Sequence, residues 1–126
     1  MSSIPADNFS ALVFFKLKEG KDYDKDAVPV MDKFVEATKT EKDMLAYAFA
    51  RSTSDPSVFV CREQYKNADA FLVHLANVGA CLEEMAQHAD ITMVNFVGSP
   101  EDCEHATLRE ATKDLPTTWL ALGTKC

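Results

Sequence analysis

Glycine, tryptophan and long apolar runs are scarce in this chain of 126 residues. It contains 4 glycines, which are scattered, and 1 tryptophan. Scattered glycines cannot build the glycine-rich loop that cradles phosphate groups in nucleotide-binding folds. No apolar run approaches the roughly 18 residues that a membrane-spanning helix needs. These absences argue against a nucleotide-binding fold of the glycine-rich type and against an integral membrane protein.

Positive charge is also in short supply. The chain has 13 Lys and Arg against 20 Asp and Glu, which gives a net charge of −7 at pH 7. A negative field repels phosphate backbones and anionic lipid surfaces, so we expect neither nucleic acid nor a membrane as a partner. The apolar fraction of 47% and the charged fraction of 26% are typical of a globular protein. We therefore expect one domain over residues 1–126.

The cysteines show no recognised framework. Cys61, Cys81, Cys103 and Cys126 form no C-x-x-C pair, and the segment from Met1 to Pro5 has no secretory pattern. We therefore expect reduced thiols and a cytoplasmic location. A transit peptide that has already been removed remains an alternative.

Hydrophobic periodicity divides the chain into strands and helices. The segments predicted as strands are 9–17, 44–52, 57–65, 91–97 and 119–122. The segments predicted as helices are 27–38, 71–86 with an interruption at Gly79, and 101–112. Asp26 is the expected N-cap of the first helix, since Pro29 then lies in the first turn, and Asn67 is the expected N-cap of the second.

The order of these elements is β-α-β-β-α-β followed by α-β. The first six elements have the ferredoxin-like, split βαβ arrangement, an antiparallel sheet with both helices on one face. We expect an α+β fold with a core over about residues 9–98. An extension over residues 99–126 adds a helix and a strand.

Both faces of the predicted sheet are apolar. In the first strand Phe9, Val13 and Phe15 point to one face, while Leu12 and Phe14 point to the other. Because an antiparallel sheet with one wet face alternates apolar and polar residues, this pattern predicts a second covering layer. Two helices cover one face only, so we expect an obligate homodimer packed sheet to sheet. The last strand joins a sheet edge of its own subunit or of the partner.

One segment, from Val60 to Leu75, resembles the antibiotic biosynthesis monooxygenase-like proteins of the dimeric α+β barrel superfamily. The shared pattern is a strand ending in Glu-x-aromatic, a capped turn and a helix that opens Ala-(Phe/Leu)-x-x-His. It is carried here by Glu63, Tyr65, Asn67, Ala70, Phe71 and His74. Segments 16–21 and 45–52 match more loosely, and the resemblance extends over roughly residues 9–98.

The resemblance implies a small monooxygenase that oxidises quinol- or anthrone-type aromatics with O₂ and needs neither metal nor flavin. An electron-rich phenol, once deprotonated, can pass an electron to O₂ itself. The protein then has to supply an apolar pocket, a base and a hydrogen-bond donor for the developing oxyanion. The alternative is a non-catalytic dimeric domain of the same fold that binds a small apolar ligand or serves in a stress response.

His74 and Glu63 are the candidate catalytic residues. His74 is expected to act as the base, because imidazole titrates near neutral pH; a structural histidine bound to a backbone carbonyl is the alternative. Glu63 lies on a strand that should be buried, and buried acids are almost always paired. It is expected to orient His74 or to contact the substrate, unless it forms an ion pair with Arg51 or Arg62.

Four further residues are candidates for substrate binding. Tyr47 and Tyr65 can line an aromatic pocket and donate a hydroxyl, although they also suit the edge of a core. Phe71 belongs to the family pattern, and Asn77 shares a helix face with His74. A local cap before Gly79 is the alternative for Asn77.

No metal site is expected. His74, Cys81 and His88 recur every seven residues and would share a helix face. Successive members would still lie about 10 Å apart along the axis, so one ion cannot bind all three. Some proteins of this fold bind haem through a helical histidine; His74 or His88 could serve, but no flanking motif supports it.

Overall fold

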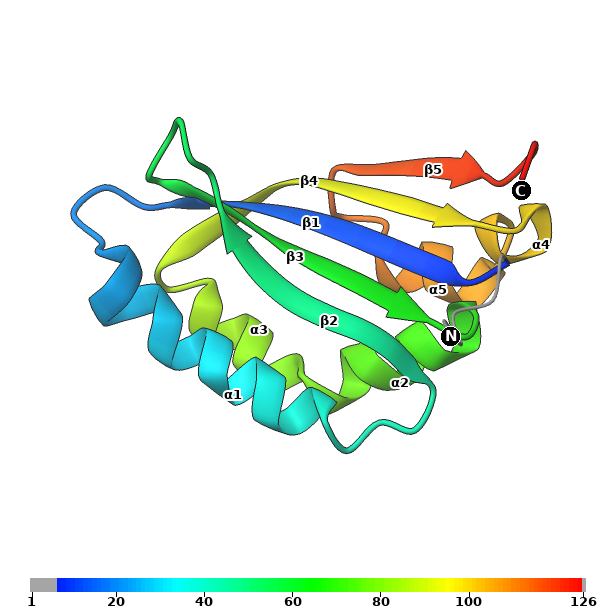
Figure 1. Ribbon diagram of the computed structural model, residues 1–126, viewed down its shortest axis with the longest axis horizontal. Helices are drawn as coiled ribbons and strands as arrows, with labels where there is room; N and C mark the ends of the chain where they lie inside the picture. Colours follow the sequence, from blue (N-terminus) through cyan, green and yellow to red (C-terminus); the bar gives the residue numbers. More distant parts are fainter. Residues whose placement is uncertain (1–6, 126) are drawn as a thin grey trace.

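The computed structural model describes residues 7–125, and a five-stranded sheet runs through it (Figure 1). The strands are β1 (Phe9–Leu17), β2 (Met44–Arg51), β3 (Val58–Tyr65), β4 (Ala89–Gly98) and β5 (Thr117–Ala121). Their order in space is β2-β3-β1-β4-β5. The first four strands pair antiparallel in the ferredoxin-like order, and β5 adds to β4 in parallel. The α+β, ferredoxin-like prediction is confirmed.

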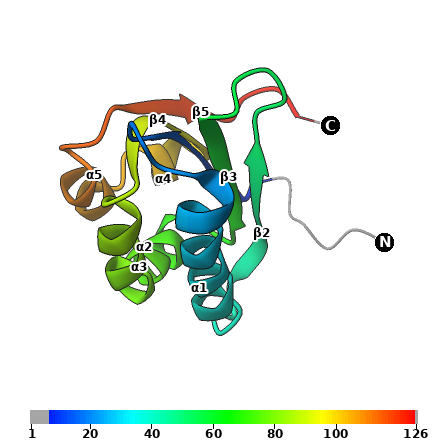
Figure 2. The same cartoon turned by 90° about the vertical axis from the view of Figure 1, so that its left-hand side faces the viewer.

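The helices lie on one side of the sheet (Figure 2). They are α1 (Val28–Thr38), α2 (Ala68–Asn77), α3 (Gly79–Met85), α4 (Pro100–Cys103) and α5 (Ala106–Ala111). A short π-helical turn, η1 (Tyr23–Ala27), precedes α1. No helix within residues 7–125 has both the length and the apolar character needed to cross a bilayer.

Alternating side chains of the sheet build the core. Phe9, Ala11, Val13 and Phe15 of β1 are buried under the helices. On the neighbouring strand Phe59 stacks on Phe15 with ring centroids 4.9 Å apart. The outward positions of β1, Leu12 and Phe14, are also apolar, so the strand has apolar residues on both faces, as the sequence predicted.

Three local details differ from the sequence-based expectation. Asp22, not Asp26, caps the first helical turn, because its carboxylate accepts from the backbone N–H of Lys25. Asp26 instead accepts from the N–H of Asp22, which closes a reciprocal capping arrangement. The helix predicted over 101–112 is broken into α4 and α5, since His105 caps α5 through an Nδ1 contact with the N–H of Leu108.

The second predicted helix ends where the sequence suggested a break. Asn67 caps α2 by accepting from the N–H of Ala70, as predicted. The helix stops at Asn77, and α3 starts at Gly79. The intervening Val78 is buried, so the change of direction packs against the core.

The face of the sheet opposite the helices is apolar and partly exposed. Leu12 and Phe14 of β1 and Val60 of β3 are half-buried there, and Met93 of β4 is 38% exposed. No helix of the described segment 7–125 covers this face (Figure 2). The sequence-based pattern of two apolar faces is therefore present in the folded chain.

The ends of the described chain lie close together. Asp7 and Lys125 form an ion pair of 3.0 Å between carboxylate and ammonium groups. Both groups are partly exposed, so the pair adds little stability. It nevertheless shows that the start of β1 and the segment after β5 meet at one end of the molecule.

Candidate active site

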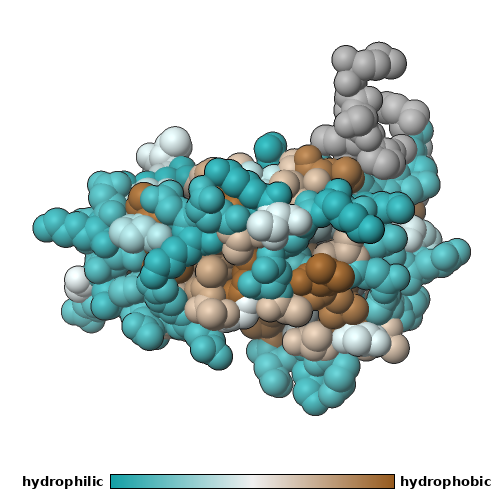
Figure 3. Space-filling model, turned by 90° about the horizontal axis from the view of Figure 1, so that it is seen from below, coloured by the Kyte–Doolittle hydropathy of each residue, from teal (hydrophilic) through white to brown (hydrophobic). Residues whose placement is uncertain are grey.

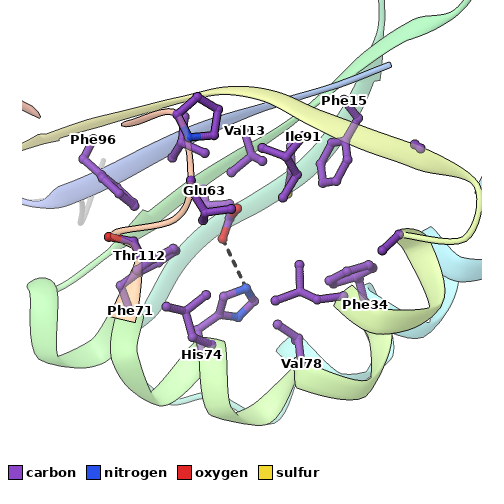
Figure 4. A pocket seen from close by; sticks show the side chains of 18 of the residues that line it. Val13, Phe15, Phe34, Glu63, Phe71, His74, Val78, Ile91, Phe96 and Thr112 are labelled. Atoms are coloured by element: carbon purple, nitrogen blue, oxygen red, sulfur yellow. Dashed lines mark ion pairs between the residues drawn. The ribbon is translucent and has the colours of Figure 1, made fainter. Parts of the chain in front are cut away.

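A cavity of about 410 Å³ lies between the sheet and the helices (Figure 4). That volume is within the range of small-molecule sites. Its walls include the aromatic side chains Phe15, Phe34, Tyr47, Phe49, Phe71 and Phe96. Among the remaining lining groups, Glu63 and His74 lie together on one side.

His74 is buried on the inward face of α2, with only 2% of its surface exposed. Its Nε2 atom lies 3.2 Å from Oε1 of Glu63, which points inward from β3. Its Nδ1 atom lies 2.9 Å from Oε2 of Glu41, in the segment between α1 and β2. The imidazole therefore bridges two carboxylates, and we call Glu41, His74 and Glu63 the charged row.

Neighbouring groups hold both carboxylates of the charged row in place. The Tyr65 hydroxyl donates to Oε1 of Glu63 at 3.0 Å. The Asn77 side-chain N–H₂ donates to Oε2 of Glu41 at 2.8 Å and to the carbonyl of Ala37 at 2.9 Å. Each glutamate thus has a second partner besides His74, which fixes its position.

The two carboxylates change the protonation of His74. Burial by itself lowers the pKa of this imidazole, but hydrogen bonds and charge from Glu63 and then Glu41 outweigh burial and raise the pKa above 6.5. The two carboxylates therefore favour the protonated form of the ring.

The other titratable groups beside the charged row stay neutral. Burial, followed by the charges of nearby groups, raises the pKa of the Tyr47 and Tyr65 hydroxyls far above 10. Burial and the charge of Glu63 raise the pKa of the Cys61 thiol well above its usual value. These groups can donate hydrogen bonds, but they do not provide anionic nucleophiles.

The predicted site residues fall into two sets. His74, Glu63, Tyr47 and Phe71 line the cavity. Tyr65 is fully buried behind Glu63, and Asn77 is exposed at the far side of Glu41. Tyr47, Phe71 and Tyr65 thus lie beside His74, whereas Asn77 reaches the site only through Glu41.

The alternative ion pairs of Glu63 with arginine do not form. Arg51 instead lies over the Tyr23 ring at 4.2 Å and donates to the carbonyl of Pro56. Arg62 is exposed, because it points to the opposite face of β3 from Glu63. Glu63 is paired with His74, as one of the sequence-based alternatives proposed.

Sequence reasoning missed Glu41. It lies in the charged stretch from Lys39 to Asp43, whose composition predicts a solvent-exposed turn. Its side chain is nevertheless only 7% exposed, because the turn after α1 folds back over α2. A glutamate in a loop carries no periodic signal that would mark it as buried.

The charged row is not built to hold a metal. Within residues 7–125 no cluster of three or more His, Cys, Asp or Glu side chains is arranged for one ion. Glu41 and Glu63 bind opposite nitrogens of one imidazole, so their oxygens do not converge. Both nitrogens of His74 are engaged, so the ring offers no free atom to a haem iron.

Comparison with known proteins shows where this fold recurs. The family model described as "Antibiotic biosynthesis monooxygenase" matches residues 8–88, well over half of the chain. No curated protein matches the sequence.

Several solved structures share the fold. MupZ from Pseudomonas fluorescens is 22% identical, covers 95% of this chain and 93% of its own, and has a TM-score of 0.82. SnoaB from Streptomyces nogalater, described as a cofactor-independent oxygenase, is 14% identical over 72% of this chain and 91% of its own, with a TM-score of 0.62. A further structure, described as an antibiotic biosynthesis monooxygenase, is 23% identical over 70% and 94%, with a TM-score of 0.61. The family match over residues 8–88 and this shared architecture agree, and the chain belongs to the antibiotic biosynthesis monooxygenase family.

Proposed function

We propose that the protein is a cofactor-independent monooxygenase that oxidises a quinol- or anthrone-type aromatic with O₂. One observation carries the proposal. A buried row of two carboxylates around an imidazole borders a cavity whose walls are largely aromatic. The family match and the description of SnoaB support the same reaction class.

The first step is removal of the substrate's phenolic or enolic proton. Both nitrogens of His74 face carboxylates, whereas Glu63 itself lines the cavity. We therefore assign Glu63 as the group that takes the proton, with His74 as its charged partner.

The second step is electron transfer from the substrate to O₂. The substrate anion gives one electron to O₂, and the resulting radical and superoxide combine to form a carbon–oxygen bond. The proton held at Glu63 moves to the terminal oxygen of this peroxide. Cleavage of the O–O bond, with loss of the remaining hydrogen on that carbon, gives a carbonyl and water. The substrate supplies all four electrons that O₂ takes up.

The cavity walls orient the substrate. Tyr47 and Phe71 both pack against the imidazole of His74, with ring centroids 5.3 and 5.8 Å away. We assign them to contact with the aromatic substrate, since stacked and tilted ring pairs are favourable. Tyr65 and Asn77 act as positioning residues, because their hydrogen bonds reach the glutamates.

We further propose that the working form is a homodimer joined through the apolar sheet face. Leu12, Phe14, Val60 and Met93 lie on that face, and such an area of apolar surface needs a cover. β5 pairs with β4 of its own chain, so it extends this face. The proposed dimer therefore does not require the two subunits to exchange their last strands.

Oxygen consumption with a panel of quinols and anthrones tests the activity. We expect turnover by the wild type and a loss of at least about 100-fold in kcat for Glu63→Gln, which keeps the shape of the side chain and removes its basicity. Lys66→Gln is the control, because Lys66 is exposed just after the end of β3 and does not line the cavity. Equal rates for Glu63→Gln and the wild type would contradict the proposal.

A non-catalytic ligand-binding domain is the second candidate. Both nitrogens of His74 contact carboxylates, and an imidazole that bridges two carboxylates can be purely structural. This observation favours the non-catalytic alternative. This alternative predicts that aromatics bind in the cavity and are recovered unchanged under O₂.

A further inference from the structure

An open groove adjoins the cavity on the helical side of the molecule. This groove, of about 480 Å³, runs between the helices α2 and α3 and the end of α5. We call it the outer groove. Its lining residues are Leu72, Leu75, Ala76, Leu82, Ala111, Thr112, Asp114 and Leu115.

Cavity and outer groove share five lining residues, which we call the neck. They are Leu75, Leu82, Thr112, Asp114 and Leu115. Shared walls mean that the two spaces adjoin at the neck. Figure 4 shows Thr112, one of the neck residues, beside Phe71 and Phe96 at one end of the cavity.

The surface of the outer groove is apolar. Leu72, Leu75, Leu82 and Leu115 are each only partly buried there. Figure 3 shows hydrophobic side chains gathered over the middle of the helical face, surrounded by hydrophilic ones. A contiguous apolar patch that opens into a cavity is suited to an apolar ligand.

Charge narrows the class of ligand. Within residues 7–125 no Lys or Arg lines the cavity or the outer groove, whereas Asp90 and Asp114 do. Asp90 has Lys18 3.7 Å away, but both groups are largely exposed. A carboxylate or phosphate on the part of the ligand in the outer groove would therefore meet Asp114 with no Lys or Arg among the described lining residues to balance it.

We propose that the substrate is elongated, with an aromatic head at Glu63 and an uncharged apolar tail that leaves through the neck into the outer groove. The position of the aromatic head rests on the proposed function. The tail is inferred separately, from the residues that line both spaces and from the apolar surface of the groove.

The extension beyond the family core builds one side of this tail site. The family model ends at residue 88, while Ala111, Thr112, Asp114 and Leu115 lie after it. The extension is held firmly against the core. Leu108 is fully buried, and the Trp119 ring packs on Phe96 with centroids 4.6 Å apart. It therefore provides a fixed wall.

A series of 6-alkyl-2-naphthols with tails of increasing length tests the tail site by calorimetry, independently of any oxidation. We expect each added methylene to tighten binding about fourfold until the tail fills the groove, as its apolar surface is buried. In Ala111→Trp the indole should fill the groove, so that this gain disappears while 2-naphthol binds as before.

Ala106→Trp is the matched control, because it places the same side chain at an exposed position of α5 outside the groove. Ala76→Trp, on the opposite wall, repeats the block if Ala111→Trp does not fold. Two results would overturn the tail site. One is a wild-type affinity that stays constant as the tail lengthens. The other is a folded Ala111→Trp or Ala76→Trp protein in which affinity still rises with tail length as in the wild type. Failure of 2-naphthol to bind would instead count against the proposed function, while tightening with tail length would still support the groove.

Discussion

The two faces of the sheet both carry apolar residues but differ in what lies among them. On the helix-covered face, Val13 and Phe15 surround a buried carboxylate, Glu63, which His74 and Tyr65 both satisfy. On the opposite face, Leu12 and Phe14 have no such group beside them and remain half-exposed. The inner face is therefore suited to chemistry and the outer face to association.

Substituting two adjacent residues of β1 gives the sharpest test of this difference. Phe15 is 3% exposed and stacks on Phe59, so Phe15→Asp should remove at least about 4 kcal/mol of stability and leave the chain largely unfolded. Circular dichroism and urea denaturation measure this loss. A folded Phe15→Asp protein of near-normal stability would contradict the assignment of the core.

Phe14→Asp should leave the chain folded and separate the subunits. The side chain points to the opposite face, and in a two-fold dimer the substitution places two new carboxylates in the interface. We expect association to weaken by about a hundredfold or more, measured by analytical ultracentrifugation. Val73→Asp serves as the control, since Val73 is 63% exposed on α2, on the helical side away from this face. A wild-type protein that sediments as a monomer would refute the proposed dimer.

Within the inner face, the two glutamates of the charged row should differ in effect. Glu63 lines the cavity, whereas Glu41 contacts His74 from behind. We expect Glu41→Gln to lower the turnover number by about tenfold, which is less than the loss in Glu63→Gln. The pH dependence of turnover should also move to lower pH, because His74 loses one of the two carboxylates that raise its pKa. Oxygen uptake between pH 5 and 9 measures both. A larger loss in Glu41→Gln than in Glu63→Gln would reverse the proposed roles.

The smallest expected effect concerns pH and stability. Because the folded pKa of His74 is raised, its imidazolium stabilises the fold fully below about pH 6.5. That contribution is lost as the pH rises through the folded pKa. Urea denaturation should therefore show wild-type stability falling above pH 6.5, whereas His74→Gln should show a flatter profile. Parallel profiles for the two proteins would mean that His74 is not charged in the fold.

Much of the fold follows from local pattern. Short apolar runs rich in β-branched and aromatic residues located the strands, and Asn67 was recognisable as a cap because it precedes an apolar helical stripe. The position of Asp22 was missed, since the π-helical turn before α1 alters the spacing between cap and Pro29. The break between α4 and α5 was missed because His105 acts as a cap through a side chain that rarely has that role.

The site was predicted in part for the same reason. Glu63 and His74 lie on regular elements and belong to the family pattern, which identified them as candidates. Glu41 lies in a turn, and its burial depends on how α1 and α2 pack together, which no local pattern encodes. The same holds for Leu115 at the neck, which reaches the cavity only because β5 pairs with β4.

The meeting of Asp7 and Lys125 has a practical consequence for rearranging the gene. Because these two positions are adjacent in space, a short linker can join them in a circular permutant (Figure 1). New ends can then be opened in the 52–57 connection between β2 and β3, whose residues are absent from the cavity walls. Such a permutant would retain every wall of the cavity while β1 and β5 become neighbours along the chain.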